Sequence, residues 1–137
     1  VLGELGLKRA LVVSSLDGLD EISISAPTQV SELANGAVRT YEIAPEDIGL
    51  ARHPISEVCG GDAAVNAAII REVFAGQRHG AYRDIVLANA GACIYVGGLA
   101  GSIKEGAAMA AETIDSGKAL AKLEQLIQRT GELANVS

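Results

Sequence analysis

Residues 28–43 read TQVSELANGAVRTYEI, and this stretch decides the fold of the first half of the chain. On either side of Asn35-Gly36, apolar and polar side chains alternate, which is the pattern of a strand with one buried face. The Asn-Gly dipeptide suits the two positive-φ positions of a type I′ turn. The stretch therefore predicts a β-hairpin with strands at 28–34 and 37–43.

Two further strands are expected before this hairpin. Residues 10–13 (ALVV) form a short apolar run rich in β-branched side chains, which is typical of a buried strand in a mixed or parallel sheet. Residues 22–25 (ISIS) alternate like a second strand. The polar residues 14–21 are expected to form the connection between them.

The rest of the chain predicts helices. Pro45 followed by two acids indicates one or two helical turns. Asp62 is a candidate N-cap for a longer helix whose apolar stripe (Val65, Ile69, Val73) is expected to face the core and whose C′ position is Gly76. Ser102 and Glu105 match a capping box. The remaining helices are expected at 82–97, from Ser102 to Gly117, and up to Gly131.

The order of these elements, strands first and helices after, predicts an α/β fold in which a mixed sheet is packed by a C-terminal set of helices. A chain of 137 residues with 49% apolar and 20% charged residues has the size and composition of one globular domain. Cys59 and Cys93 lie far apart without zinc-ligand spacing, so both are expected to be buried thiols.

The charge balance argues against several classes of partner. Eleven Lys and Arg against 17 Asp and Glu give a net charge of -6. Such a chain lacks the basic surface that nucleic acids and anionic membranes require, so neither is expected as a partner. Residues 85–101 are apolar, but their glycines and Asn89 favour a buried helix over a membrane span. No signal peptide is expected, because a basic n-region followed by an apolar stretch is missing, and the start at Val1 is expected to be internal to a longer protein.

The segment Asp17-Gly18-Leu19-Asp20-Glu21 gathers three carboxylates directly after an apolar strand. Ligands of open α/β sheets bind at the carboxyl ends of the strands. Magnesium is usually held by one or two carboxylates together with substrate phosphates and water. Asp20 and Glu21 are therefore candidate Mg²⁺ ligands. The alternative is an ordinary turn at Asp17-Gly18 with two solvated acids.

Other polar residues carry weaker signals. Gly60-Gly61-Asp62 has the form of a phosphate cradle at a helix N-terminus, but the Asp62 carboxylate would repel an anion there, which favours a tight turn with a side-chain cap. His53 and His79 are expected to be surface histidines, because no neighbouring residues mark a catalytic triad. No residue is identified as a general base.

Three blocks of the chain, in this order, resemble the anthranilate phosphoribosyltransferase family. They are VVSSLDGLDEISISAPTQVSELANG at 12–36, VCGGDAAVNAAIIREVFAG at 58–76, and DIVLANAGACIYVGGLAGSIKEGAAMAAETIDSGKALAKLEQL at 84–126. The resemblance runs from about Glu4 to Arg129. It implies a cytoplasmic pentosyltransferase of tryptophan biosynthesis that transfers the phosphoribosyl group of phosphoribosyl pyrophosphate to anthranilate.

The resemblance also implies how the chain relates to the complete enzyme. Family members combine a small helical domain with a larger α/β domain similar to nucleoside phosphorylases, and they are expected to form homodimers. Residues 1–137 would be the C-terminal portion of the α/β domain. The helical domain, the Gly-Thr-Gly-Gly-Asp phosphate loop and the arginine that meets anthranilate would precede it, so the chain alone is expected to be inactive.

At the level of residues, the family's Asp-Glu pair falls on Asp20 and Glu21, which the resemblance implies are Mg²⁺ ligands, neither nucleophile nor base. No catalytic or substrate-binding residue is assigned within this chain. Ser14 and Ser15 replace the His-Gly that many members carry before this loop, which leaves the shape of the loop open. The alternative is a noncatalytic relative of the same fold that binds nucleic acid, which the acidic charge disfavours.

Overall fold

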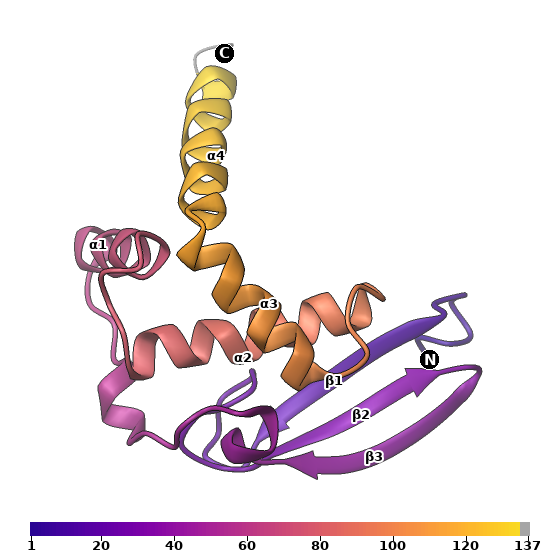
Figure 1. Ribbon diagram of the computed structural model, residues 1–137. Helices are drawn as coiled ribbons and strands as arrows, with labels where there is room; N and C mark the ends of the chain where they lie inside the picture. The colour runs from indigo at the N-terminus through magenta and orange to yellow at the C-terminus, as the bar shows by residue number, and fades with distance from the viewer. Residues whose placement is uncertain (135–137) are drawn as a thin grey trace.

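A three-stranded antiparallel sheet and a group of helices on one side of it make up the fold (Figure 1). The computed structural model describes residues 1–134. The strands pair in the order β1-β2-β3, and their bounds are β1 Arg9–Ser15, β2 Thr28–Ala34 and β3 Ala37–Ile43. This arrangement confirms the α/β class expected from the sequence.

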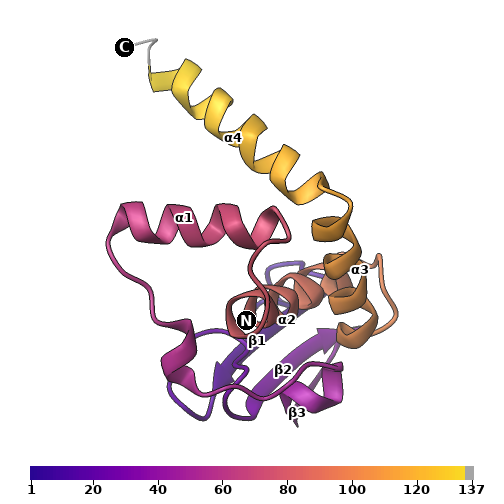
Figure 2. The same cartoon turned by 60° about the vertical axis from the view of Figure 1, so that its left-hand side comes forward.

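Helices follow the sheet in the chain. α2 and α3 lie over the sheet, whereas α4 projects away from the rest of the molecule in both views (Figures 1 and 2). Two short 3₁₀ helices connect β3 to α1. The bounds are η1 Pro45–Ile48, η2 Ile55–Val58, α1 Ala63–Phe74, α2 Ala81–Val96, α3 Ile103–Asp115 and α4 Lys118–Ala134.

The predicted hairpin is confirmed to the residue. β2 and β3 pair in the register that sets Ala34 opposite Ala37, leaving two residues in the turn. Those residues, Asn35 and Gly36, have φ angles of 52° and 75°. Two successive positive φ values define a type I′ turn, whose twist matches that of the strands it joins.

The strand predicted at 10–13 exists, but its pairing differs from the expectation of a mixed or parallel sheet. β1 runs antiparallel to β2, with Ser15 opposite Thr28. Its burial is also incomplete, because Val12 is 56% exposed. The core cluster covers only one face of β1, where Leu11 and Val13 pack against it, so the alternate side chain of Val12 is left on the open face.

The strand predicted at 22–25 is wrong, because these residues form an irregular buried segment. Mostly side chains, not a neighbouring strand, satisfy the backbone here. The N–H and C=O of Ile22 bond to the amide of Asn89. The N–H of Ser23 donates to the hydroxyl of Thr28 at 3.1 Å. Because these backbone groups are already bonded, the segment cannot pair with a neighbouring strand.

The helix starts follow their capping signals. The Asp62 carboxylate accepts a hydrogen bond from the Val65 N–H at 2.9 Å, and Gly76 follows the helix with a φ of 70°. The expected burial of the apolar stripe holds only at its C-terminal end: Val73 is 2% exposed and Val65 48%. Only the second half of α1 therefore reaches the core.

The capping box at α3 is formed in a modified way. Ser102 Oγ accepts from the Glu105 N–H at 3.1 Å, but the Glu105 carboxylate accepts from the Gly101 N–H at 2.7 Å in place of that of Ser102. α4 continues through Gly131 to Ala134, so the predicted end is wrong. A glycine ends a helix only where the chain turns after it, and here the helix continues past Gly131.

Both cysteines are exposed, which overturns their prediction as buried thiols. Cys59 follows η2 at the surface. Cys93 lies on the side of α2 that faces β1, where the two elements line an open apolar groove of about 400 Å³. The small side chains near Cys93 in the sequence suggested that this thiol would be buried between helices. The small residue that meets α3, Gly91, lies on a different side of α2 from Cys93.

Two clusters of apolar side chains form the core. The first joins the 22–25 segment to α2 and α3, and the second joins α1, α2 and α3. Alanines of α2 in the first cluster and of α3 in the second allow close approach of the helices. The buried members are Ile22, Ile24, Ile48, Ala81, Ala88, Ala92 and Ile103 in the first cluster, and Val73, Leu87, Ala110 and Ile114 in the second.

A buried carboxylate ties the sheet to α2. The side chain of Glu32 is 3% exposed and accepts hydrogen bonds from Tyr95 at 2.6 Å, Arg39 at 2.8 and 3.0 Å, and Tyr41 at 2.9 Å. Burial alone would raise the pKa of Glu32, but these donors and the Arg39 charge outweigh burial and lower it below 4.5. Burial and the same contact raise the pKa of Tyr41 to about 12.

Glu32→Ala is expected to lower the free energy of unfolding by about 2–3 kcal/mol at neutral pH, because two tyrosine hydroxyls and a guanidinium lose a charged acceptor. A carboxyl whose pKa is lower in the folded state than in the unfolded state stabilises the fold at pH values above its unfolded pKa. This stabilisation is lost as the pH falls through the folded pKa. The difference from wild type should therefore shrink below pH 4.5. Urea unfolding at several pH values measures it, and a pH-independent difference would contradict this account.

Candidate functional site

The candidate site lies in the connection between β1 and β2, which folds around the carboxylate of Asp17. Three serine hydroxyls donate to this carboxylate: Ser23 at 2.6 Å, together with Ser15 and Ser25. The Leu19 N–H approaches it at 3.5 Å. Asp17 therefore acts as the internal anchor of the loop and has little capacity left for a metal ion.

The ionisation of Asp17 follows from these contacts. Partial loss of water would raise its pKa, but the three serine hydroxyls and the Leu19 N–H outweigh that effect and lower the pKa to about 2. The carboxylate is thus charged throughout the neutral range. Its contribution to loop stability is present above the ordinary value of 3.8 and is lost as the pH falls through about 2.

Asp20 and Glu21, the predicted metal ligands, have a different environment. Both side chains are exposed, and neither carboxylate has a hydrogen-bond or ion-pair partner among the described residues. Partial burial and the adjacent Asp20 charge raise the pKa of Glu21 above 4.5. A cation between the two carboxylates would relieve this repulsion, so the pair is electrostatically suited to bind one.

The residues on both sides of the pair are fixed. Before it, Leu19 is held by Ser15, whose hydroxyl accepts from the Leu19 N–H at 2.9 Å and whose N–H donates to the Leu19 carbonyl at 3.0 Å. After it, Ile22 is 1% exposed and bonds to Asn89 of α2. The two acids are therefore presented to solvent from a span anchored at each end.

The two carboxylates suit Mg²⁺ chemically but are too few to complete its coordination. Carboxylate oxygens are the hard ligands that Mg²⁺ prefers. Within residues 1–134 no cluster of three or more acidic, histidine or cysteine side chains is placed to hold a metal. A site with two carboxylates relies on water and substrate phosphates for its other ligands, which is the usual condition of Mg²⁺ in phosphate-transfer sites.

Sequence reasoning missed the residues that shape this loop. Ser23 and Ser25 alternate with Ile22 and Ile24, a pattern that predicts a strand, whereas the hydroxyls converge on Asp17. In the sequence, Asn89 stands out only as a polar break in an apolar helix. That break is an available signal, because a half-buried amide in a helix needs partners outside the helix ladder.

The glycine loop before α1 is a closed turn. Its Gly61 N–H donates to the side chain of Asn66 at 2.8 Å, and the Asn66 amide donates back to the Gly61 carbonyl at 3.0 Å. Asp62 occupies the Val65 N–H. The N–H groups that a phosphate cradle would need are thus partly used, which agrees with the expected turn and cap.

His53 departs from the expected surface histidine. Its side chain is 18% exposed, and its Nε2 lies 2.8 Å from Asp84 and its Nδ1 3.5 Å from Glu57. Asp84 lies on α2, and Glu57 is four residues along the chain, a spacing that the sequence interpretation overlooked. His79 is exposed, as predicted.

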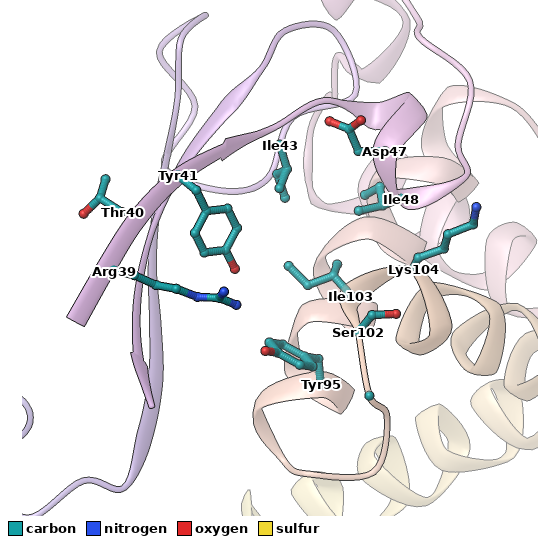
Figure 3. Close-up of a pocket in the computed structure, with 11 residues that line it drawn as sticks. Arg39, Thr40, Tyr41, Ile43, Asp47, Ile48, Tyr95, Ser102, Ile103 and Lys104 are labelled. Atoms are coloured by element: carbon teal, nitrogen blue, oxygen red, sulfur yellow. The ribbon is translucent and has the colours of Figure 1, made fainter. Parts of the chain in front are cut away.

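A separate pocket of about 350 Å³ lies between β3, η1 and the start of α3. Figure 3 shows Arg39 and Tyr41 projecting from β3 toward Tyr95 of α2, with Ser102 and Lys104 on the opposite wall. Arg39 is already paired with Glu32. None of the lining residues comes from the Asp17 loop, so this pocket is distinct from the candidate metal site.

Comparisons with known proteins give the family of the sequence. Residues 1–120 match the model of the glycosyl transferase family, a/b domain. Among curated relatives, the anthranilate phosphoribosyltransferase of Rubrobacter xylanophilus is 50% identical over 130 residues, 95% of this chain and 38% of the relative. That of Azorhizobium caulinodans is 51% identical over 98% of this chain and 39% of the relative. The chain thus spans about two fifths of these relatives.

Solved structures agree with this similarity. The crystal structure of anthranilate phosphoribosyltransferase from Thermus thermophilus superposes with a TM-score of 0.82 at 38% identity, over 90% of this chain and 36% of that one. The Saccharomyces cerevisiae enzyme in complex with PRPP and Mg has a TM-score of 0.79 at 29% identity, over 89% of this chain and 35% of that one.

Within the described residues, no helix is both long and apolar enough to cross a bilayer.

Proposed function

This chain belongs to the glycosyl transferase family, a/b domain, and on that basis we propose that the complete protein is an anthranilate phosphoribosyltransferase of tryptophan biosynthesis. By the complete protein we mean this chain together with the segments that its relatives carry in addition. The observation that carries the proposal is the carboxylate pair of Asp20 and Glu21, which has no partner within residues 1–134 and lies between two anchored residues.

In this proposal the chain supplies the metal-binding part of the site. Asp20 and Glu21 would hold Mg²⁺, which supplies positive charge beside the pyrophosphate group of the substrate. Asp17 keeps the loop folded through its serine contacts and remains uncoordinated. The chain's contribution is positioning and electrostatics, which are large terms in group transfer.

The reaction itself is a displacement at the anomeric carbon of phosphoribosyl pyrophosphate. The anthranilate amine forms the new C–N bond while the C–O bond to pyrophosphate breaks, and the amine loses a proton. We assign no residue of this chain to that proton transfer. Asp20 and Glu21 contribute as metal ligands and form no bond to substrate carbon.

We further propose that the remaining contacts come from segments outside this chain. Residues 1–137 would form the C-terminal portion of the α/β domain, while a helical domain and the phosphate-binding loop come from the rest of the complete protein. The support is that the chain spans 38% of its relative from Rubrobacter xylanophilus. By the same resemblance, we expect a homodimer that acts in the cytoplasm.

An activity assay tests the proposal directly. The complete protein is incubated with anthranilate, phosphoribosyl pyrophosphate and Mg²⁺, and both the loss of anthranilate fluorescence and the release of pyrophosphate are followed. We expect the two signals to appear in equal amounts, to stop on addition of EDTA and to return with excess Mg²⁺. Absence of both signals in folded protein would refute the proposal.

A further inference from the structure

We infer that Asn89 is a positioning residue for the Asp20–Glu21 pair: its side-chain amide fixes the peptide plane that follows Glu21 and thereby the direction in which that carboxylate projects. The inference rests on the proposed function and adds to it a residue from the middle of α2. Asn89 itself would not touch the metal ion.

Both polar atoms of the Asn89 side chain make hydrogen bonds within the chain. Its Oδ1 accepts from the Ile22 N–H at 2.9 Å. Its Nδ2 donates to the Ile22 carbonyl at 3.0 Å and to the Ile85 carbonyl, one turn earlier in α2, also at 3.0 Å. Asn89 thus pairs with Ile22 as a neighbouring strand would, across 67 positions of sequence.

This pairing acts on Glu21 through covalent geometry. The Ile22 N–H and the Glu21 carbonyl belong to one planar peptide unit. Holding the N–H with Asn89 therefore holds this whole peptide plane relative to α2, and the Glu21 Cα, which lies in the same plane, with it. On the other side of the pair, Leu19 is held by Ser15 at the end of β1 and approaches Asp17 of the loop. Among the hydrogen bonds of the two anchors, only those of Asn89 tie the pair to a helix.

Loss of the Asn89 amide would leave two polar groups of Ile22 without partners in a residue that is 1% exposed. An unsatisfied buried N–H or carbonyl is costly, so the peptide planes would turn toward water or toward other acceptors. The Ile22 side chain would stay in place, since it packs in the first core cluster with Ala88 and Ala92. The change would therefore fall on the direction of Glu21 more than on the core.

Asn66 provides a matched control within the same chain. It makes the same two hydrogen bonds to the backbone of Gly61, at 2.8 and 3.0 Å. That loop is exposed and contains neither of the proposed metal ligands. Asn66→Ala removes the same amide and the same kind of backbone pairing as Asn89→Ala, but away from the site.

The test compares wild type, Asn89→Ala and Asn66→Ala in the complete protein, with Mn²⁺ as the probe. Free Mn²⁺ is measured by electron paramagnetic resonance during titration in the presence of phosphoribosyl pyrophosphate. Residues that orient metal ligands typically affect metal affinity by about 10–100-fold, and we expect a loss of that size for Asn89→Ala only. The Mg²⁺ concentration for half-maximal activity should rise by a similar factor, while the rate at saturating Mg²⁺ changes by only a few-fold.

Thermal unfolding separates positioning from folding. Both variants should lose some stability, but only Asn89→Ala should lose Mn²⁺ affinity. Should that variant fail to fold, Asn89→Ser keeps a small polar group that cannot form both bonds to Ile22, and it should show the same loss. If the Asn89 variants bind Mn²⁺ as tightly as Asn66→Ala does, the inference is overturned. An active wild type would in that case still support the proposed function. A wild type with neither activity nor Mn²⁺ binding would overturn the proposed function and the inference together.

Discussion

Replacing both acids of the candidate site, as Asp20→Asn with Glu21→Gln, is expected to lower the turnover of the complete protein by at least about 100-fold at Mg²⁺ concentrations that saturate wild type. Removing a group that only hydrogen-bonds to a metal ligand already lowers metal affinity or activity by about 10–100-fold. This variant removes the ligands themselves. Steady-state rates over a range of Mg²⁺ concentrations measure the effect.

The same double variant should fold at least as well as wild type. Neither carboxylate has a partner among the described residues. Their mutual repulsion contributes to the raised pKa of Glu21. Removing both charges therefore takes away no contact of the fold, and the thermal midpoint should remain the same or rise slightly.

Glu42→Gln with Glu112→Gln is the matched control, because it removes two charges from exposed glutamates that lie outside the loop. This control should retain wild-type turnover. Full activity with unchanged Mg²⁺ dependence in the Asp20–Glu21 variant would contradict the assignment of the metal ligands. Equal losses in both variants would show an effect of net charge and contradict it as well.

Gly91→Ala is expected to cause the largest loss of stability, about 3 kcal/mol in the free energy of unfolding. α2 and α3 meet here backbone to backbone: a Cβ on Gly91 would lie 2.5 Å from the Ala107 nitrogen and 2.8 Å from its Cα. Backbone atoms of a helix cannot turn aside as a flexible side chain can. The helices must separate, and overpacking of this kind costs about 1–3 kcal/mol or more. Urea unfolding measures the loss.

Gly131→Ala is the control for this substitution, because it adds the same methyl group to a helix. Among the described residues, no atom other than the nearby backbone of α4 itself lies within 4 Å of the position that its Cβ would occupy. Alanine is favoured over glycine inside a helix by about 1 kcal/mol, so this variant should be slightly more stable than wild type. A Gly91→Ala protein with wild-type stability would mean that the helices do not meet as closely as described.

Elements specified by local chemistry were predictable from the sequence. The hairpin follows from Asn35-Gly36 and the alternation around it, and the start of α1 follows from the side chain of Asp62. In both cases the residues that determine the structure lie within a few positions of one another. Local backbone preference and a single side-chain hydrogen bond are then sufficient.

Features that depend on distant partners were not predictable in this way. The 22–25 segment looks like a strand until Asn89 supplies the bonds that a neighbouring strand would have made. His53 looks isolated until α2 places Asp84 beside it. For the candidate site, the sequence predicts Asp20 and Glu21 as metal ligands by their chemistry, but it could not show which carboxylate the loop uses internally. The structure assigns that role to Asp17.

The central claim is that this chain carries the metal-binding carboxylates of a phosphoribosyltransferase while the groups that hold the phosphates lie elsewhere. Two carboxylates in water hold a hydrated cation weakly, since their attraction is screened. Without backbone N–H groups to fix them, the pyrophosphate oxygens cannot complete the site. We therefore expect affinity for the proposed substrate to come from the segments outside this chain.

Calorimetric titration with phosphoribosyl pyrophosphate in Mg²⁺ tests this claim most directly, run on the complete protein and on the 137-residue chain whose folding has been checked by circular dichroism. We predict a saturable isotherm for the complete protein and none for the chain alone. A clear micromolar isotherm from the chain alone would contradict the account, because it would mean that the phosphate site is complete within these residues.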